Sequence, residues 1–174
     1  MKKAGVILWG MVEKVSLWCL SALFFILRRE LTPQAKAAFL QFVKFGLVGV
    51  SNTVVNYAIY LGVLVCLRAL GVWKGYDYLA ATAAGFVLSV LWSFFWNNKF
   101  VFTVEEGEQR QVLKALVRTY ISYSFTGLFL NSAFMVLWVD VLHISEFLAP
   151  IFNLLMSVPV NFLINKFWAF KKEG

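Results

Sequence analysis

Amide and basic side chains recur in this sequence where they could bind a polar, phosphorylated ligand. The phrase Asn-x-x-[Phe/Trp]-x-Phe occurs twice, as "NNKFVF" from Asn97 and as "NKFWAF" from Asn165. An amide both donates and accepts hydrogen bonds, as a sugar hydroxyl does, and Lys or Arg pairs with phosphate. These residue types favour recognition of a sugar or a phosphate over acid–base chemistry.

Four basic residues stand at the ends of long apolar stretches. If those stretches are helices of one bundle, the four would form a ring at the depth of lipid head groups, suited to a phosphate or pyrophosphate. Arg118 fits this role best, because its planar fork can make two hydrogen bonds to one phosphate. The alternative is that all four only fix topology and contact ordinary anionic lipid. The candidates are Lys44, Lys99, Arg118 and Lys166.

Uncharged amides lie within the apolar stretches and at their ends. An Asn side chain in hydrocarbon needs a partner, so each should face the bundle interior or a wet cavity. They could join helices by hydrogen bonds worth about 0.6 to 2 kcal/mol each, or they could form a polar track for a sugar head group. Both interpretations stay open. The track candidates are Asn52, Asn56, Asn97, Asn131, Asn161 and Asn165, and Asn153 is a further amide of this kind.

Catalytic groups and metal ligands are sparse. The apolar stretches hold no carboxylate pair, and no nucleophile stands beside a base. The single histidine, His143, lies near Asp140, and Cys19 and Cys66 lack metal-ligand spacing. A phosphate-binding P-loop is also missing. The sequence therefore predicts a protein that is not an enzyme and has no catalytic residues, no metal and no cofactor.

The composition indicates a chain that resides in lipid. Hydrophobic residues make up 61% of the 174 residues and mean hydropathy is +0.75, whereas only 14% of residues are charged. Soluble domains are roughly 45–50% apolar and 25% charged. The net charge of +7 is not concentrated on a polar face of the kind that binds nucleic acid. We expect an all-α integral membrane protein with no nucleic-acid partner.

Four stretches are long enough to cross a membrane, which takes about 20 mostly apolar residues. Short turns pair them into two hairpins, and the positive-inside rule places both termini and the middle loop in the cytoplasm. The predicted spans are 45–67, 78–96, 119–139 and 147–165. The basic residues that support this topology are Lys36, Lys44, Lys99, Arg110, Lys114, Arg118, Lys166, Lys171 and Lys172.

Residues 1–38 form a separate N-terminal segment and linker, ahead of a four-helix membrane domain at 39–174. At helical periodicity its polar residues fall on one narrow stripe, which favours an amphipathic helix lying in the interface. A fifth span is the rival, but it would bury Glu13 and Lys14 near mid-bilayer. Thr32 and Pro33 predict the start of the next helix. The stripe consists of Lys3, Gly10, Lys14, Ser21 and Arg28.

The repeated phrase falls at the end of each predicted hairpin, which indicates two tandem two-helix units. Asn97 aligns with Asn165 and Phe102 with Phe170, although the second phrase has Phe167 where the first has Lys99. Two units that each cross the membrane twice share one orientation and are related by an axis along the membrane normal. Asn56 and Asn131 lie at similar depth in the first helix of each unit, about 18 Å of helix rise from its basic start.

Residues 39–170 resemble the GtrA-like family of small four-span membrane proteins. The resemblance is carried by "FVKFGLVGVSNTVVNYAIY", with its aromatic entry, Gly and Asn/Thr, and by "NNKFVF". It implies that the chain moves polyprenyl-phosphate-linked sugars across the bacterial inner (cytoplasmic) membrane for glycosylation of cell-envelope polysaccharides. The family positions implied are Asn52, Asn56, Asn97 and Lys99 in the first half, and Asn131, Asn165 and Lys166 in the second.

Other functions and partners stay open. The chain could be a non-transporting membrane anchor or accessory subunit of a glycosyltransferase, or a small-solute channel, although it has no filter-like segment. The expected partners are polyprenyl phosphate or its sugar-linked form, membrane lipids and a glycosyltransferase. Four helices make a thin wall around a large head group, so we also expect a homo-oligomer.

Overall fold

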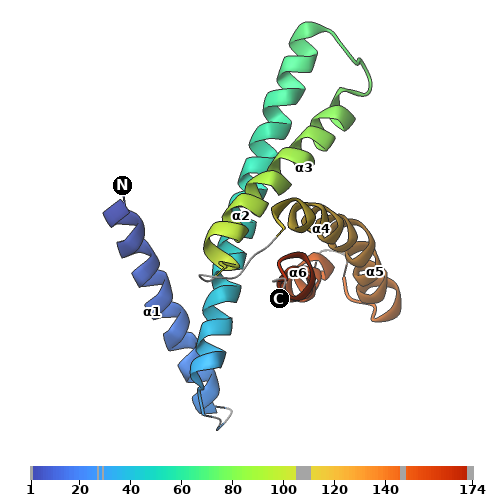
Figure 1. Cartoon of the computed structure of the whole chain (residues 1–174). Helices are drawn as coiled ribbons and strands as arrows, with labels where there is room; N and C mark the ends of the chain where they lie inside the picture. The colour runs from blue at the N-terminus through green and yellow to red at the C-terminus, as the bar shows by residue number, and fades with distance from the viewer. Residues whose placement is uncertain (1, 27, 29, 105–110, 146–147, 172–174) are drawn as a thin grey trace. The chain divides into compact units, whose positions relative to one another are not determined.

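The computed structural model describes the chain except residues 1, 27, 29, 105–110, 146–147 and 172–174 (Figure 1). Over the described residues every regular element is a helix, which confirms an all-α protein. Four short segments, labelled η, are π-helices that continue or interrupt the α-helices. The elements are α1 (Lys2–Ile26), α2 (Pro33–Leu70), α3 (Asp77–Trp96), η1 (Asn97–Val101), α4 (Val112–Ser124), η2 (Phe125–Leu130), α5 (Asn131–Val136), η3 (Leu137–Val141), α6 (Ala149–Ile164) and η4 (Asn165–Ala169).

The chain forms two compact units, residues 1–45 and 46–174, and the boundary falls within α2. The first unit holds α1 and the opening turns of α2. Thr32 begins α2 as predicted: its Oγ1 accepts from the Ala35 N–H at 3.2 Å and its carbonyl from the Lys36 N–H at 3.1 Å. Pro33 takes the first helical position, where a missing N–H costs nothing.

Among the described residues, four helical segments are long and apolar enough to cross a membrane. Four spans were also predicted, but the four segments are not the same as the predicted ones. Helix α6, within the predicted span 147–165, is not one of the four segments; its 16 residues include two amides and two prolines. Part of α1 is one of them, so the in-plane helix and the fifth span both stay predictions. The segments are Trp9–Ile26, Pro33–Leu70, Asp77–Val101 and Val112–Val141.

The first hairpin of the second unit pairs α2, from Gly46 onward, with α3. Figure 1 shows the two helices running antiparallel from the loop that joins them. An ion pair between Arg68 Nε and Asp77 Oδ2, 2.7 Å apart, closes this loop. Further along, Gly85 lets α3 approach α2 closely, since a Cβ there would lie 3.1 Å from the carbonyl oxygen of Asn56. The hairpin is therefore tightly packed at this point.

The second hairpin pairs a helical run from Val112 to Val141 with α6 and η4. The run extends the predicted span 119–139 and is interrupted by the π-helices η2 and η3, which the sequence did not predict. Helix α6 contacts the run from η3 to α4, and η4 contacts α4. Pro159 lies inside α6. The two helical arms of this hairpin thus run antiparallel along their whole length.

The two hairpins meet through four buried phenylalanines whose contacts are reciprocal. Phe94 stacks on Phe170 with ring centres 5.6 Å apart, and the equivalent pair, Phe162 and Phe102, stacks at 6.0 Å. Phe102 and Phe170 stack on each other at 4.7 Å. A contact in which residue i of one copy meets residue j of the other, and vice versa, is the signature of two-fold symmetry. This confirms the two tandem units.

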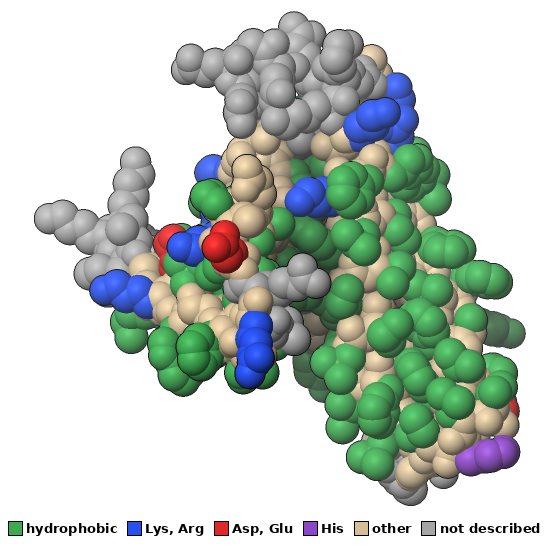
Figure 2. Space-filling model, turned by 90° about the horizontal axis from the view of Figure 1, so that it is seen from below, with side chains coloured by type: hydrophobic (Ala, Val, Ile, Leu, Met, Phe, Trp, Pro, Cys, Tyr) green, Lys and Arg blue, Asp and Glu red, His purple; other side chains and the backbone are tan. Residues whose placement is uncertain are grey.

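The surface suits a lipid environment. Figure 2 shows one face of the molecule, on which hydrophobic side chains form a broad, continuous layer over the helices. On the helices that carry the single histidine, His143, the visible Lys and Arg side chains lie toward the opposite end. Such an arrangement fits the predicted separation of a basic cytoplasmic end from an outer hairpin. Arg110 and Lys172, which contributed to that topology prediction, lie outside the described residues.

The close approach at Gly85 yields a test of the first hairpin. Gly85→Val should lower its thermal unfolding temperature in detergent, because the added methyl groups would press on the α2 backbone. Gly62→Val is the control, since a Cβ at Gly62 meets nothing within 4 Å. Equal unfolding temperatures for the two variants would contradict the packing described for α2 and α3.

Candidate functional site

The repeated phrase forms the same local structure twice. Asn97 and Asn165 each begin a π-helix, and their carbonyls accept from the Phe102 and Phe170 N–H groups, both at 2.8 Å. Both asparagines are completely buried. Each side chain also bonds to the residue four positions before it, Asn97 to Ser93 Oγ at 3.2 Å and Asn165 to Asn161 Oδ1 at 2.9 Å. The amides therefore fix the ends of α3 and α6.

In the first hairpin, hydroxyl groups of α3 provide the partners of the predicted amides. Asn56 Nδ2 donates to Ser89 Oγ at 3.1 Å, which joins α2 to α3. The Ser93 and Tyr123 hydroxyls lie 2.6 Å apart, and Asn97 Nδ2 lies 3.5 Å from the same Tyr123 hydroxyl. Because Tyr123 belongs to α4, this cluster links the first hairpin to the second.

In the second hairpin, polar side chains face each other along both helices. We call this set the polar seam. Its hub is Asn161 Oδ1, which lies 3.3 Å from Ser122 Oγ, 3.3 Å from Thr126 Oγ1 and 2.9 Å from Asn165 Nδ2. Asn165 Nδ2 also donates to Ser122 Oγ at 3.0 Å. The polar seam consists of Arg118, Ser122, Thr126 and Asn131 on the 112–141 run, and Asn153, Ser157, Asn161 and Asn165 on α6 and η4.

The other end of the polar seam is an amide pair. Asn153 Nδ2 donates to both the side-chain oxygen and the carbonyl oxygen of Asn131, the latter at 3.1 Å, and Ser157 donates to Asn153 Oδ1 at 3.3 Å. Asn131 is the fifth residue after Thr126, so a regular α-helix would turn it away from that face. The π-turn of η2 takes up one extra residue. Asn131 is thereby kept on the side that faces α6.

Three of the four predicted phosphate-binding cations lie in the second unit. Arg118 contacts another segment: its Nη1 donates to the Trp168 carbonyl at 3.3 Å, and its guanidinium lies 5.8 Å from the Trp168 ring centre. Arg118 thus joins the start of α4 to η4.

Lys99 Nζ lies 5.5 to 5.9 Å from the rings of Phe95, Trp96 and Phe100, which belong to the same end of its own hairpin.

The remaining lysines take other positions. Lys166 Nζ lies 5.5 Å from the Phe162 ring and 5.8 Å from the Phe167 ring. It follows Asn165 directly, whereas Lys99 is the third residue of η1, so the two lysines leave their π-helices at different positions. Lys44 belongs to the first unit, where its Nζ lies 5.0 Å from the Trp9 ring. The repeat therefore does not make Lys99 and Lys166 equivalent.

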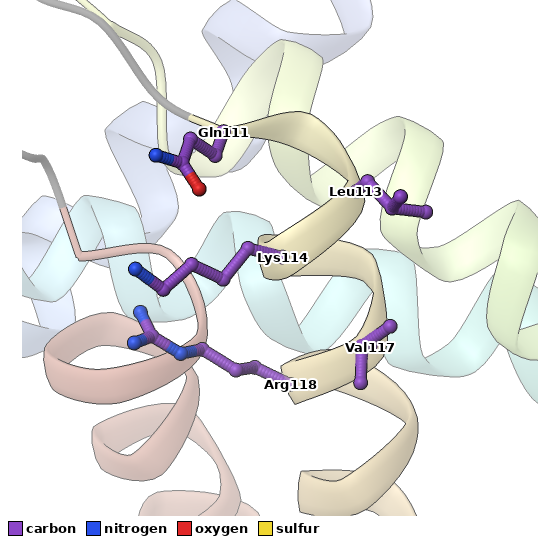
Figure 3. Close-up of a pocket in the computed structure, with 5 residues that line it drawn as sticks. All are labelled: Gln111, Leu113, Lys114, Val117 and Arg118. Atoms are coloured by element: carbon purple, nitrogen blue, oxygen red, sulfur yellow. The ribbon is translucent and has the colours of Figure 1, made fainter.

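Arg118 also lines a surface hollow of about 550 Å³ at the start of α4. Figure 3 shows Lys114 and Arg118 of α4 pointing the same way as Gln111, which precedes the helix, whereas Leu113 and Val117 point away from them. From the sequence, Lys114 was predicted only to help fix the topology. The hollow adds it and Gln111 to the groups that could hold an anion near Arg118.

Two of the buried asparagines keep an unpaired acceptor. Asn97 Oδ1 and Asn165 Oδ1 have no hydrogen-bond partner among the described residues, and the same is true of Asn52 Oδ1 in α2. A buried polar atom without a partner costs about 1–3 kcal/mol. These oxygens are therefore places where a hydrogen-bond donor would be stabilised. Over the described residues, no group of three His, Cys, Asp or Glu side chains is arranged to hold a metal.

The sequence identified the amides but missed the hydroxyls that bind them. Of the predicted track residues, Asn56, Asn97, Asn131, Asn161 and Asn165 all bond to other polar groups, most of them across a helix pair. Ser93, Ser122 and Tyr123 were not candidates. A signal for two of the missed hydroxyls was present in α3, where Ser89, Ser93 and Asn97 recur every four residues and so share one helix face.

The bonds of Asn165 yield a stability test. Asn165→Ala should lower the free energy of unfolding by about 1–3 kcal/mol, since buried partners on Ser122 and Asn161 would lose their bonds. Thr82→Ala is the control, because the Thr82 hydroxyl is exposed and bonds only its own helix, to the Tyr78 carbonyl. Unfolding in detergent measures both. An Asn165→Ala value no larger than that of Thr82→Ala would contradict the bonding described.

Comparisons with known proteins agree with this architecture. The family described as "GtrA/DPMS, transmembrane domain" matches residues 44–170. The chain is 30% identical over 126 residues to "Uncharacterized membrane protein YwcD" of Bacillus subtilis (strain 168), covering 72% of this chain and 93% of that protein. It is 24% identical over 125 residues to "Cell wall teichoic acid glycosylation protein GtcA" of Listeria monocytogenes serovar 1/2a, covering 69% and 86%.

No solved structure matches the chain. The family match begins at the last residues of the first unit and ends on the second repeated phrase, so it covers both hairpins. It also confirms the resemblance to GtrA-like proteins that the two quoted motifs indicated. The chain therefore belongs to the GtrA/DPMS transmembrane-domain family.

Proposed function

We propose that this protein binds a polyprenyl-phosphate-linked sugar and helps its head group cross the cytoplasmic membrane of a bacterium. One observation carries the proposal. Arg118 lines the hollow at the start of α4 and also stands at one end of the polar seam. A cation that can hold a phosphate is thereby placed next to a row of uncharged groups that can bond to sugar hydroxyls.

The relatives support a role in envelope glycosylation. One of them carries teichoic acid glycosylation in its name, and both come from bacteria. Glycosylation outside the cell needs activated sugar on the outer face of the membrane. The head group of a polyprenyl-linked donor made in the cytoplasm therefore has to cross from the inner to the outer leaflet. A small membrane protein without an evident catalytic centre fits that step better than it fits sugar transfer.

The proposed mechanism divides the work between cations and amides. Arg118 and Lys114 hold the phosphate at the membrane surface, with Lys99 and Lys166 at the ends of the hairpins adding positive charge. Sugar hydroxyls then exchange water for amide and hydroxyl partners, which lowers the cost of taking them out of water. The prenyl tail stays in the bilayer throughout. Movement is facilitated and needs no nucleotide.

The same proposal fixes an orientation. Both termini and the loop between the hairpins lie in the cytoplasm, where the basic residues are concentrated. The Arg68–Asp77 loop and the loop that carries His143 then face outward. Two hairpins enclose little space for a sugar, so a homo-oligomer completes the wall around the head group.

Removal of the guanidinium tests the proposal directly. In proteoliposomes, a fluorescent polyprenyl-phosphate-linked hexose should cross faster with the protein than without it, as measured by quenching of outer-leaflet label. Arg118→Ala should slow this crossing by about ten- to a hundredfold, because a charge-assisted hydrogen bond contributes about 1.5–3 kcal/mol. Arg118→Lys should retain part of the rate, since it keeps the charge but not the fork.

Lys74→Ala is the charge-matched control, because Lys74 is exposed in the loop that we place on the outer side. Its rate should equal that of the unaltered protein. Identical rates for empty liposomes, unaltered protein and Arg118→Ala would contradict transport. Copurification with a glycosyltransferase in the absence of crossing would instead support the alternative, an accessory subunit of that enzyme.

A further inference from the structure

We propose that the head group travels along the polar seam of the second hairpin, and that the first hairpin serves as its rigid support. This inference rests on the proposed function and assigns the path to one of the two repeats. Near-symmetric repeats would ordinarily be expected to share the path equally. Three differences between the hairpins, in polar length, in packing and in access, argue against equal use.

The first difference is the length of the polar row. On α6 and η4 the row runs without a gap at four-residue spacing, and Asn153 to Asn165 covers about 18 Å of helix rise. The matching row on α3 holds an unbroken run of polar groups only from Ser89 to Asn97, about 12 Å. It continues as Gly85 and Ala81, which can bond to no sugar hydroxyl through their side chains, and ends at Asp77, which is already paired with Arg68. The hydrocarbon core is about 30 Å thick, so the shorter row leaves most of it uncovered.

The second difference is packing. Gly85 brings α3 against the backbone of α2, and the Arg68–Asp77 ion pair closes the far end of that hairpin. In the second hairpin the position of Gly85 is taken by Asn153, whose side chain bonds across to Asn131. Pro159 lies six residues further along α6 and cannot donate the backbone bond that would tie the helix there. At these positions the second hairpin is therefore joined by hydrogen bonds that can be exchanged, whereas the first is joined by a close backbone contact.

The third difference is access. Asn131, at one end of the polar seam, is an exposed residue, and Arg118, at the other end, lines the surface hollow. Between them the hub oxygen of Asn161 already has three potential donors around it, from Ser122, Thr126 and Asn165. Sugar hydroxyls can replace these donors one at a time, so no group need be left without a bond during passage.

The repeats themselves provide a matched pair of variants. Ser157 on α6 and Ser89 on α3 occupy equivalent positions, and each hydroxyl takes part in a bond to an Asn side chain. Ser157→Ala should slow crossing of the polyprenyl-phosphate hexose about threefold or more, whereas Ser89→Ala should leave the rate within experimental error. Asn161→Ser, which gives α6 the residue that α3 has at Ser93, should slow crossing like Ser157→Ala.

Each result is decisive once the unfolding temperature shows that the variants are folded. Slowing by Ser157→Ala and Asn161→Ser alone supports the path in the second hairpin. Equal slowing by Ser89→Ala, or slowing by Ser89→Ala only, overturns it while leaving transport itself established. If the unaltered protein does not accelerate crossing, the proposed function fails and this inference fails with it.

Discussion

The side-chain oxygen of Asn161 is the point on which the second hairpin depends. Hydrocarbon supplies no hydrogen-bond donors, so an amide placed there must find its partners within the protein. Ser122 and Thr126 from one helix and Asn165 from the next turn of its own helix gather around this one atom. These bonds favour the pairing of α4 with α6 and the face that each helix presents to the other. Apolar contacts alone would allow the helices to slide past each other, because a Leu side chain is solvated about as well by lipid tails as by another helix.

The π-helices are the backbone's response to the same constraint. A helix that carries polar groups at four-residue spacing drifts off its partner, since four residues exceed one α-turn. A π-turn absorbs one additional residue and corrects the drift. In η2 the correction returns Asn131 to the face that carries Thr126, and in η1 and η4 it follows directly upon the buried Asn97 and Asn165. Phe102 and Phe170, at the ends of those two turns, then reach each other and join the hairpins.

The sequence predicted the features that follow from the type and local spacing of residues. It did not predict those that depend on how two helices are rotated relative to each other. Thr32 and Pro33, the paired hairpins and the equivalence of Asn97 with Asn165 all follow from local patterns. The π-turns, the reciprocal phenylalanine stacking and the role of Tyr123 do not, because each needs the relative rotation of two helices. Composition also showed the amides of α6, Asn153 and Asn161, but not the side chains that bond to them.

The two hairpins share fixed points and differ in the residues between them. Both keep a fully buried alanine at the same place, Ala81 and Ala149, and both keep the asparagine that begins the last π-turn. Between those fixed points one copy has Gly85, Ser89 and Ser93, and the other has Asn153, Ser157 and Asn161. Small residues give close contact and a stiff pair of helices, whereas amides give bonds that can be exchanged. The proposed function calls for both properties, since the protein would have to hold its shape while a polar group passes, and the two unequal hairpins supply them within 174 residues.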